Sequence, residues 1–175
     1  FVLKRATDAF VDEKFLESQW KELCFVEKPK LTTATREFEG FEALLKVNGA
    51  TFYYLPQDEK VTIDSLYCRD AAIATDHGMI LCNMGKASRV NEPDAEHRLF
   101  RQNQIPVLGQ IKNPGTIEGG DCAWVDGNTL AVGESYRTNQ EGIRQLKQML
   151  VPLGVEVLVV SLQHYKGPLD VFHLM

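Results

Sequence analysis

Three short clusters of polar residues are the part of this sequence best suited to chemistry. They are Arg69-Asp70, Glu118-Gly119-Gly120-Asp121 and Phe172-His173-Leu174. Each lies at the edge of an apolar run typical of a strand, and a strand end holds a side chain rigidly. Carboxylates and an imidazole are the groups that hold a cation and move its protons. The clusters therefore predict a site for a cationic substrate, although none of them contains a convincing nucleophile.

Each of these residues also has a structural interpretation. Two glycines let the backbone approach a ligand closely between Glu118 and Asp121, but Gly-Gly turns with solvated acids are common. Asp70 next to Arg69 is equally typical of a strand end closed by an ion pair. His173 between two apolar residues is compatible with a hydrogen-bonded core histidine. The polar clusters therefore indicate a functional site only when they are considered together.

Composition limits the kinds of protein this chain belongs to. The 175 residues predict a single domain over residues 1–175. A net charge of -5 and a pI near 5.4 argue against nucleic acid as a partner. No apolar run is long enough to span a membrane, and the four cysteines form no CxxC pair. We therefore expect a cytoplasmic protein with reduced thiols and no membrane partner. Glu118, Asp121 and His173 are residue types that can bind a divalent metal, but their spacing follows no known ligand motif, so no metal is expected.

The elements that must position the clusters follow from hydrophobic periodicity and turn residues. Residues 8–35 lack a clear period and are expected to form an irregular surface loop. Helices are predicted near 38–47, 92–102 and 140–150. The predicted strands are 1–4, 51–55, 66–75, 79–83, 105–108, 122–125, 129–132 and 156–161. His173 is expected on a further strand-like run.

Two stretches of the chain have the same order of elements. Each is a strand, a turn, a strand, a helix and a strand, and each hairpin is followed by a Ser-containing turn and an arginine, Arg89 or Arg137. Arg89 and Arg137 are 48 positions apart, and Asp70 and Asp121 are 51 apart. Such ββαβ repeats indicate an α/β fold, either blades around an axis or one mixed sheet.

Taken together, the motifs resemble the guanidino-group-modifying enzymes, a superfamily that includes dimethylarginine dimethylaminohydrolase, arginine deiminase and the amidinotransferases. The resemblance extends from about residue 66 to the end of the chain. It rests on five motifs in order: Tyr67-Cys68-Arg69-Asp70, Gly85-x-x-Ser88-Arg89, Glu118-Gly119-Gly120-Asp121, Gly133-x-Ser135-x-Arg137-Thr138-Asn139 and Phe172-His173-Leu174.

This resemblance implies a pentein-type α/β propeller built from ββαβ repeats, of which this chain would hold the N-terminal blades. It also implies a catalytic cysteine beyond residue 175. None of the four cysteines here is assigned as the nucleophile. The carboxylates near Cys68 and Cys122 would raise the pKa of these thiols.

The resemblance also implies a role for each site residue. Asp70 and Glu118 would hold the guanidinium nitrogens of the substrate. Arg89 and Arg137 would hold the substrate carboxylate, or acids near it. Asp121 would support the loop and the histidine. His173 would protonate the departing amine and then activate water, and the distant cysteine would form a thiouronium intermediate.

The expected function is therefore hydrolysis of the guanidino group of an arginine derivative, without a metal or an organic cofactor. The arginine deiminases carry an acid two residues after the histidine, where this chain has Met175, and this difference favours a dimethylarginine dimethylaminohydrolase-like enzyme. Arginine deiminase and amidinotransferase activities are alternatives, and so is a non-catalytic binding protein of the same fold. Whether the protein forms a homodimer is left open.

Overall fold

The computed structural model describes residues 1–164, 166–167 and 172–174. The chain divides into two compact units, Phe1–Cys68 and Arg69–Met175. The single domain expected over residues 1–175 stays a prediction. Among the described residues, no helix is both long and apolar enough to cross a membrane.

The first unit is mainly helical. Strands β1 (Val2–Leu3) and β2 (Tyr53–Tyr54) pair in parallel. Three helices, α1 (Ala6–Phe10), α2 (Glu13–Gln19) and α3 (Leu31–Val47), lie between them in the sequence, and the 3₁₀ turn η1 (Ile63–Leu66) follows. Their small core consists of Ala6, Ala9, Phe10, Leu16, Leu23 and Ile63.

The expectation of an irregular loop over residues 8–35 was wrong, because α1, α2 and the start of α3 lie there. Local interactions explain the helices. Asp12 caps α2 by accepting a hydrogen bond from the Phe15 amide at 2.7 Å, and Lys28 forms ion pairs with Glu13 and Glu17. Helices α1 and α2 are too short to show a clear helical repeat of apolar residues in the sequence. Each nevertheless buries apolar side chains, such as Phe10 and Leu16.

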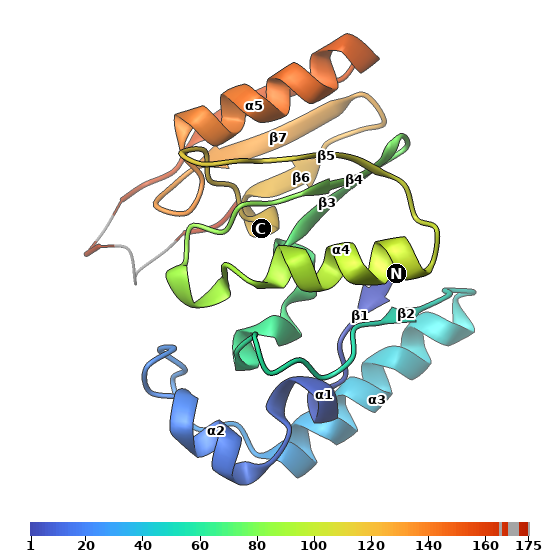
Figure 1. Ribbon diagram of the computed structural model, residues 1–175, viewed down its shortest axis with the longest axis vertical. Helices are drawn as coiled ribbons and strands as arrows, with labels where there is room; N and C mark the ends of the chain where they lie inside the picture. The colour runs from blue at the N-terminus through green and yellow to red at the C-terminus, as the bar shows by residue number, and fades with distance from the viewer. Residues whose placement is uncertain (165, 168–171, 175) are drawn as a thin grey trace. The chain divides into compact units, whose positions relative to one another are not determined.

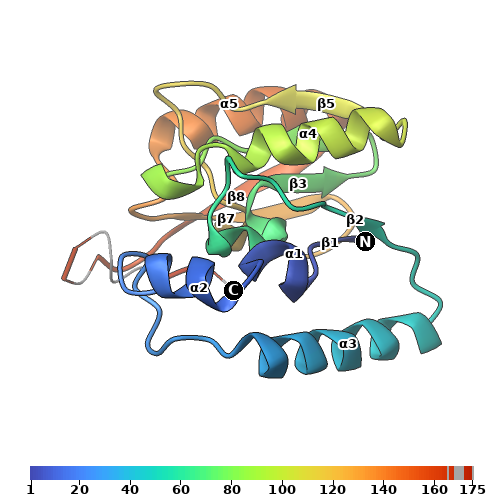
Figure 2. The same cartoon turned by 60° about the horizontal axis from the view of Figure 1, so that its bottom comes forward.

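The second unit contains the two expected repeats (Figures 1 and 2). In the first sheet, β3 (Ala72–Thr75) is antiparallel to β4 (Gly78–Leu81), which is parallel to β5 (Val107–Gln110). In the second sheet, β6 (Cys122–Trp124) is antiparallel to β7 (Thr129–Glu134), which is parallel to β8 (Glu156–Ser161). Helix α4 (Glu92–Gln102) joins β4 to β5, and α5 (Gln140–Leu150) joins β7 to β8, followed by the 3₁₀ turn η5 (Val151–Leu153).

These are two separate three-stranded sheets, so the alternative of one mixed sheet is wrong. The helix boundaries of α4 and α5 agree with the prediction. They are set by signals visible in the sequence: Pro93 in the first turn of α4, and Asn139, which caps α5 by accepting from the Gly142 amide at 2.8 Å.

A short 3₁₀ turn precedes the first strand of each sheet. The turn η2 (Cys68–Asp70) leads into β3, and η4 (Gly119–Asp121) leads into β6. The strand predicted over 66–75 is therefore confirmed only from Ala72 onward. A third turn, η3 (Ala87–Arg89), follows β4. The strand expected around His173 was also wrong, since residues 172–174 have no regular secondary structure.

One apolar core unites the two sheets of the second unit. Its fully buried members come from both sheets and from α5, and include Ile80, Ile111, Ile117, Leu130, Val132, Leu146 and Leu150. An isolated antiparallel bridge between Asn83 and Ile117 also links the segment after β4 to the segment before η4. The sheets therefore form a shared support for the turns that carry Asp70 and Asp121.

We predict that Leu146→Ala lowers the free energy of unfolding by about 2–5 kcal/mol, because it removes a fully buried side chain from the centre of this core. Lys147→Ala on the exposed face of the same helix is the control and should change it by less than about 0.5 kcal/mol. Urea denaturation of both variants measures the difference. Equal effects would contradict the placement of α5.

Candidate functional site

The guanidinium of Arg69 ties the two acid-bearing turns together. Its Nη1 donates to the Gly119 carbonyl oxygen at 2.8 Å, and its Nη2 donates to the Cys122 carbonyl oxygen at 2.7 Å. These carbonyls flank Asp121 in the chain, while Asp70 is the residue after Arg69. The Arg69 side chain of η2 therefore fixes the backbone of η4, and Asp70 and Asp121 are held near each other.

The two glycines of η4 make this convergence sterically possible. A Cβ on Gly119 would collide with the Arg69 carbonyl oxygen. A Cβ on Gly120 would lie 3.0 Å from Asp70 Oδ1 and 3.2 Å from His173 Nδ1. Asp70 and His173, 103 positions apart in the sequence, thus approach one point beside the Gly120 backbone. Any larger residue at position 120 would force one of these side chains to shift by a few tenths of an ångström.

His173 is held by Asp121. Nδ1 of the imidazole lies 3.0 Å from Asp121 Oδ1, and the Asp121 side chain is completely buried. The other carboxylate oxygen of Asp121 accepts from Ser135 Oγ at 2.6 Å. Ser135 Oγ in turn accepts from the amides of Arg137 and Thr138. A charged carboxylate at this depth is satisfied on both oxygens, so it orients the histidine ring.

The electrostatics of the site favour a protonated histidine. The hydrogen bond that the His173 ring donates to Asp121 raises the pKa of the histidine above its ordinary value of 6.5. Burial opposes this rise, and the charges of Asp121, Glu118 and Asp70 add to it. An imidazole with a raised pKa keeps its proton to a higher pH than an ordinary histidine does. It is therefore suited to act as a general acid.

Arg89 is buried between two carboxylates. Its Nε and Nη2 donate to the two oxygens of Glu92, at 2.9 and 2.7 Å, and its Nη1 donates to Asp70 Oδ2 at 2.6 Å. Burial alone would lower the pKa of this guanidinium, but the hydrogen bonds and charge of Glu92, together with the charge of Asp70, raise it. Arg89 thus contacts acids of the site, the second of the two roles that the sequence suggested.

Glu118 is almost completely buried. Its Oε1 accepts from the Lys86 amide at 2.9 Å and from Arg137 Nη1 at 3.3 Å. Its own amide donates to Thr138 Oγ1 at 3.2 Å. Arg137, like Arg89, is therefore an arginine paired with an acid, and the two sheets supply equivalent arginine-carboxylate pairs.

Each of the six expected site residues is thus bonded to another one of them, in the pairs Asp70–Arg89, Glu118–Arg137 and Asp121–His173. Sequence reasoning missed Glu92, which lies three residues after Arg89, the spacing of neighbours on one helical face. It also did not predict that Ser135, which lies within the fourth motif, would donate a hydrogen bond to Asp121.

The four cysteines are free thiols. Burial raises the pKa of Cys122 to about 12, with a further contribution from the charge of Asp121. Burial also raises the pKa of Cys82 well above its ordinary value, and Cys122 adds to it. Both thiols are therefore protonated and unreactive at neutral pH. Burial is a larger cause than the neighbouring carboxylate that the sequence pointed to.

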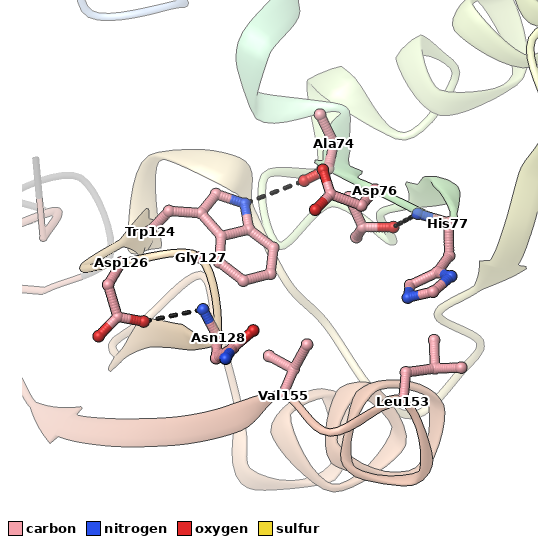
Figure 3. Close-up of a pocket in the computed structure, with 10 residues that line it drawn as sticks. Ala74, Asp76, His77, Trp124, Asp126, Gly127, Asn128, Leu153 and Val155 are labelled. Carbon is pink, nitrogen blue, oxygen red and sulfur yellow. Dashed lines mark hydrogen bonds between the residues drawn. The ribbon is translucent and has the colours of Figure 1, made fainter.

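A separate pocket of about 410 Å³ lies at the opposite ends of β3 and β6 from these acids (Figure 3). The two hairpin turns line it with Asp76, His77 and Asp126, and Trp124 donates its indole N–H to the Ala74 carbonyl oxygen at 2.9 Å. No group of three or more His, Cys, Asp or Glu side chains among the described residues is placed to hold a metal ion.

Comparison with known proteins identifies the family. The arginine deiminase family model matches residues 57–167, well over half of the chain. The chain belongs to the arginine deiminase family. It is 30% identical over 136 residues to N(G),N(G)-dimethylarginine dimethylaminohydrolase from Pseudomonas aeruginosa, covering 78% of this chain. The enzyme of the same name from Streptomyces coelicolor is 31% identical over 97 residues, which is 55% of this chain and 37% of that protein.

The solved structures agree with this assignment. A cysteine-to-serine mutant of the Pseudomonas aeruginosa enzyme, complexed with citrulline, superposes on 99% of this chain and 62% of that one, with a TM-score of 0.77 and 27% identity. The pentein-type fold expected from the sequence is thus confirmed for this family member. The chain spans only about half of the Pseudomonas aeruginosa sequence, 53%.

We predict that Asp121→Asn lowers the pKa of His173, because the aspartate is the main cause of its rise and burial then dominates. Titration of the imidazole signals by NMR measures the shift. Asp126→Asn, at an exposed turn, is the control and should leave the histidine unchanged. An unaltered His173 pKa in Asp121→Asn would contradict the pairing.

The same pair predicts a pH dependence of stability. A folded-state pKa above the ordinary 6.5 means that the Asp121–His173 contribution is complete below pH 6.5. It is lost as the pH rises through the folded-state pKa. The difference in unfolding free energy between the wild type and Asp121→Asn should therefore shrink as the pH is raised, and urea denaturation across that range measures it. A constant difference would contradict this.

Proposed function

We propose that this chain is part of a hydrolase that acts on the guanidino group of an arginine derivative, as a dimethylarginine dimethylaminohydrolase. The observation that supports it best is the convergence of Asp70, the Asp121–His173 pair and Gly120 on one point. A planar guanidinium with several N–H donors needs carboxylates at such a point, and its cleavage needs a proton donor beside them.

In this proposal Asp70 and Glu118 receive the substrate's guanidinium nitrogens. Asp70 is the more accessible of the two, because 17% of its side chain is exposed against 1% for Glu118. Arg89 and Arg137 hold these carboxylates in place through their ion pairs with Asp70 and Glu118. The cationic end of the substrate is therefore oriented by charge.

The chemistry proposed for His173 has two steps. A cysteine thiolate, supplied by the protein beyond residue 175, attacks the guanidine carbon. The bond from that carbon to the methylated nitrogen then breaks, and the methylated amine leaves with a proton from His173. In the second step His173 takes a proton from water, whose oxygen attacks the thiouronium carbon. The carbon–sulfur bond breaks, which releases citrulline and regenerates the thiolate.

Two further activities of the same class remain alternatives, arginine deimination and transfer of the amidino group to an amine. Met175, on which the choice against deimination rests, lies outside the described residues. A binding protein without activity is the alternative from another class, and the Asp121–His173 pair speaks against it, since binding alone needs no proton donor. We further propose a cytoplasmic location. A homodimer is the alternative to a monomer, and sedimentation of the full-length protein distinguishes them.

We predict that the full-length protein releases dimethylamine and citrulline from asymmetric dimethylarginine, measured by chromatography of the products. Asp70→Asn should lower kcat/KM by about a hundredfold, because a carboxylate that pairs with a desolvated cation contributes several kcal/mol. Asp76→Asn, an exposed carboxylate at the other end of β3, is the matched control and should retain activity.

The other outcomes distinguish the alternatives. Ammonia and citrulline formed from arginine would assign the protein as a deiminase. Product formed only in the presence of an acceptor amine would assign it as an amidinotransferase. Release of neither amine nor ammonia from any arginine derivative would overturn the proposed hydrolase.

A further inference from the structure

The carboxylates around Arg89 form a cluster that the proposed mechanism does not fully use. Glu92 and Glu96 lie on successive turns of α4, and both are almost completely buried. Glu92 binds Arg89 through two hydrogen bonds, while Asp70 receives one from the same guanidinium. Charged groups at this depth strongly influence one another, so their balance matters for any ligand of Asp70.

Among the three side chains of Asp70, Arg89 and Glu92, the charges do not cancel. One guanidinium, Arg89, faces the two carboxylates of Glu92 and Asp70. The positive charge of Arg89 is compensated chiefly by the Glu92 carboxylate, because two parallel N–H···O bonds form a stronger contact than one. The excess negative charge therefore resides on Asp70, whose side chain is the most exposed of the three.

Glu96 does not add to this charge. Burial raises its pKa well above the ordinary value, and the charge of Glu92 raises it further. Its Oε1 has no hydrogen-bond partner among the described residues. Both observations fit a carboxylic acid that keeps its proton at neutral pH, so the cluster of Asp70, Arg89 and Glu92 keeps its net negative charge.

We propose that Glu92 is the residue that makes the site selective for a cation: by neutralising Arg89, it leaves the negative charge of Asp70 to the ligand. Without Glu92, Arg89 would pair more strongly with Asp70, which would then offer less negative charge to an incoming guanidinium. Glu92 is then a positioning residue, since it acts through Arg89 and touches no substrate. This inference rests on the proposed function.

The test compares two ligands that differ in charge at the same end. Dimethylarginine carries a cationic guanidinium, whereas citrulline carries a neutral ureido group on the same amino-acid frame. For the full-length protein, steady-state kinetics gives KM for dimethylarginine, and competition gives the inhibition constant of citrulline. We expect Glu92→Gln to raise KM about tenfold more than the citrulline constant, the effect of one unit charge in a partly buried site.

Three matched variants separate charge from structure. Glu92→Asp keeps the charge and should keep the ratio of the two constants. Glu96→Gln replaces a protonated acid by a neutral amide in the same cluster, so the ratio should again be unchanged. The double variant Arg89→Met with Glu92→Met removes both charges and leaves Asp70 negative. It should also keep the ratio, and it tests the inference if Glu92→Gln does not fold.

The results that overturn the inference differ from those that overturn the proposed function. Equal weakening of both ligands by Glu92→Gln would mean that Glu92 only supports the fold, and no change in either would mean that Asp70 binds independently of it. A changed ratio in the double variant would also contradict the charge argument. Failure of the wild-type protein to process any guanidine would overturn the proposed function itself, and this inference with it.

Discussion

The site depends on the hydrogen bonds between one guanidinium and two backbone carbonyls. Arg69 leaves the first 3₁₀ turn and donates to the Gly119 and Cys122 carbonyl oxygens on either side of the second. Asp70 follows Arg69 directly, and Asp121 lies between the two acceptors, so the same contact sets the position of both acids. The Gly120 backbone then leaves the space in which Asp70 and His173 approach each other.

Burial of charge is the second constraint, and the buried ions of the site are paired with one another or with nearby polar groups. Asp121 has His173 and Ser135, Glu118 has Arg137, and Arg89 has Glu92 and Asp70. Desolvation makes an uncompensated ion at such depth costly, so the loss of one member affects the others. The hydrogen bond to Asp121 raises the pKa of His173, whereas burial itself raises the pKa of the Cys82 and Cys122 thiols out of the reactive range.

Much of the second unit could be predicted from the sequence. Its periodic strands, Pro93 and Asn139 mark the elements clearly, and five ordered motifs indicated the family and the acids. The first unit could not be predicted as well, because α1 and α2 are short and are stabilised by a cap at Asp12 and ion pairs of Lys28. The Arg89–Glu92 pair was missed because ordinary i, i+3 charge pairs are frequent on helix surfaces, and only burial distinguishes this one. Arg69 gave no sign that its partners would be carbonyls 50 residues away.

The contacts within each sheet join residues close in the sequence, whereas the contacts of the site join residues far apart. Each sheet is complete within one continuous stretch, 72–110 or 122–161, and its parallel strand is reached through a single helix. Each can therefore gain most of its own contacts soon after its segment is synthesised. The acids, by contrast, meet only when both stretches have docked and His173 has joined them. The reactive centre therefore depends on contacts between distant segments, and a chain that has formed its sheets and helices but not these contacts would lack a place to bind a guanidinium.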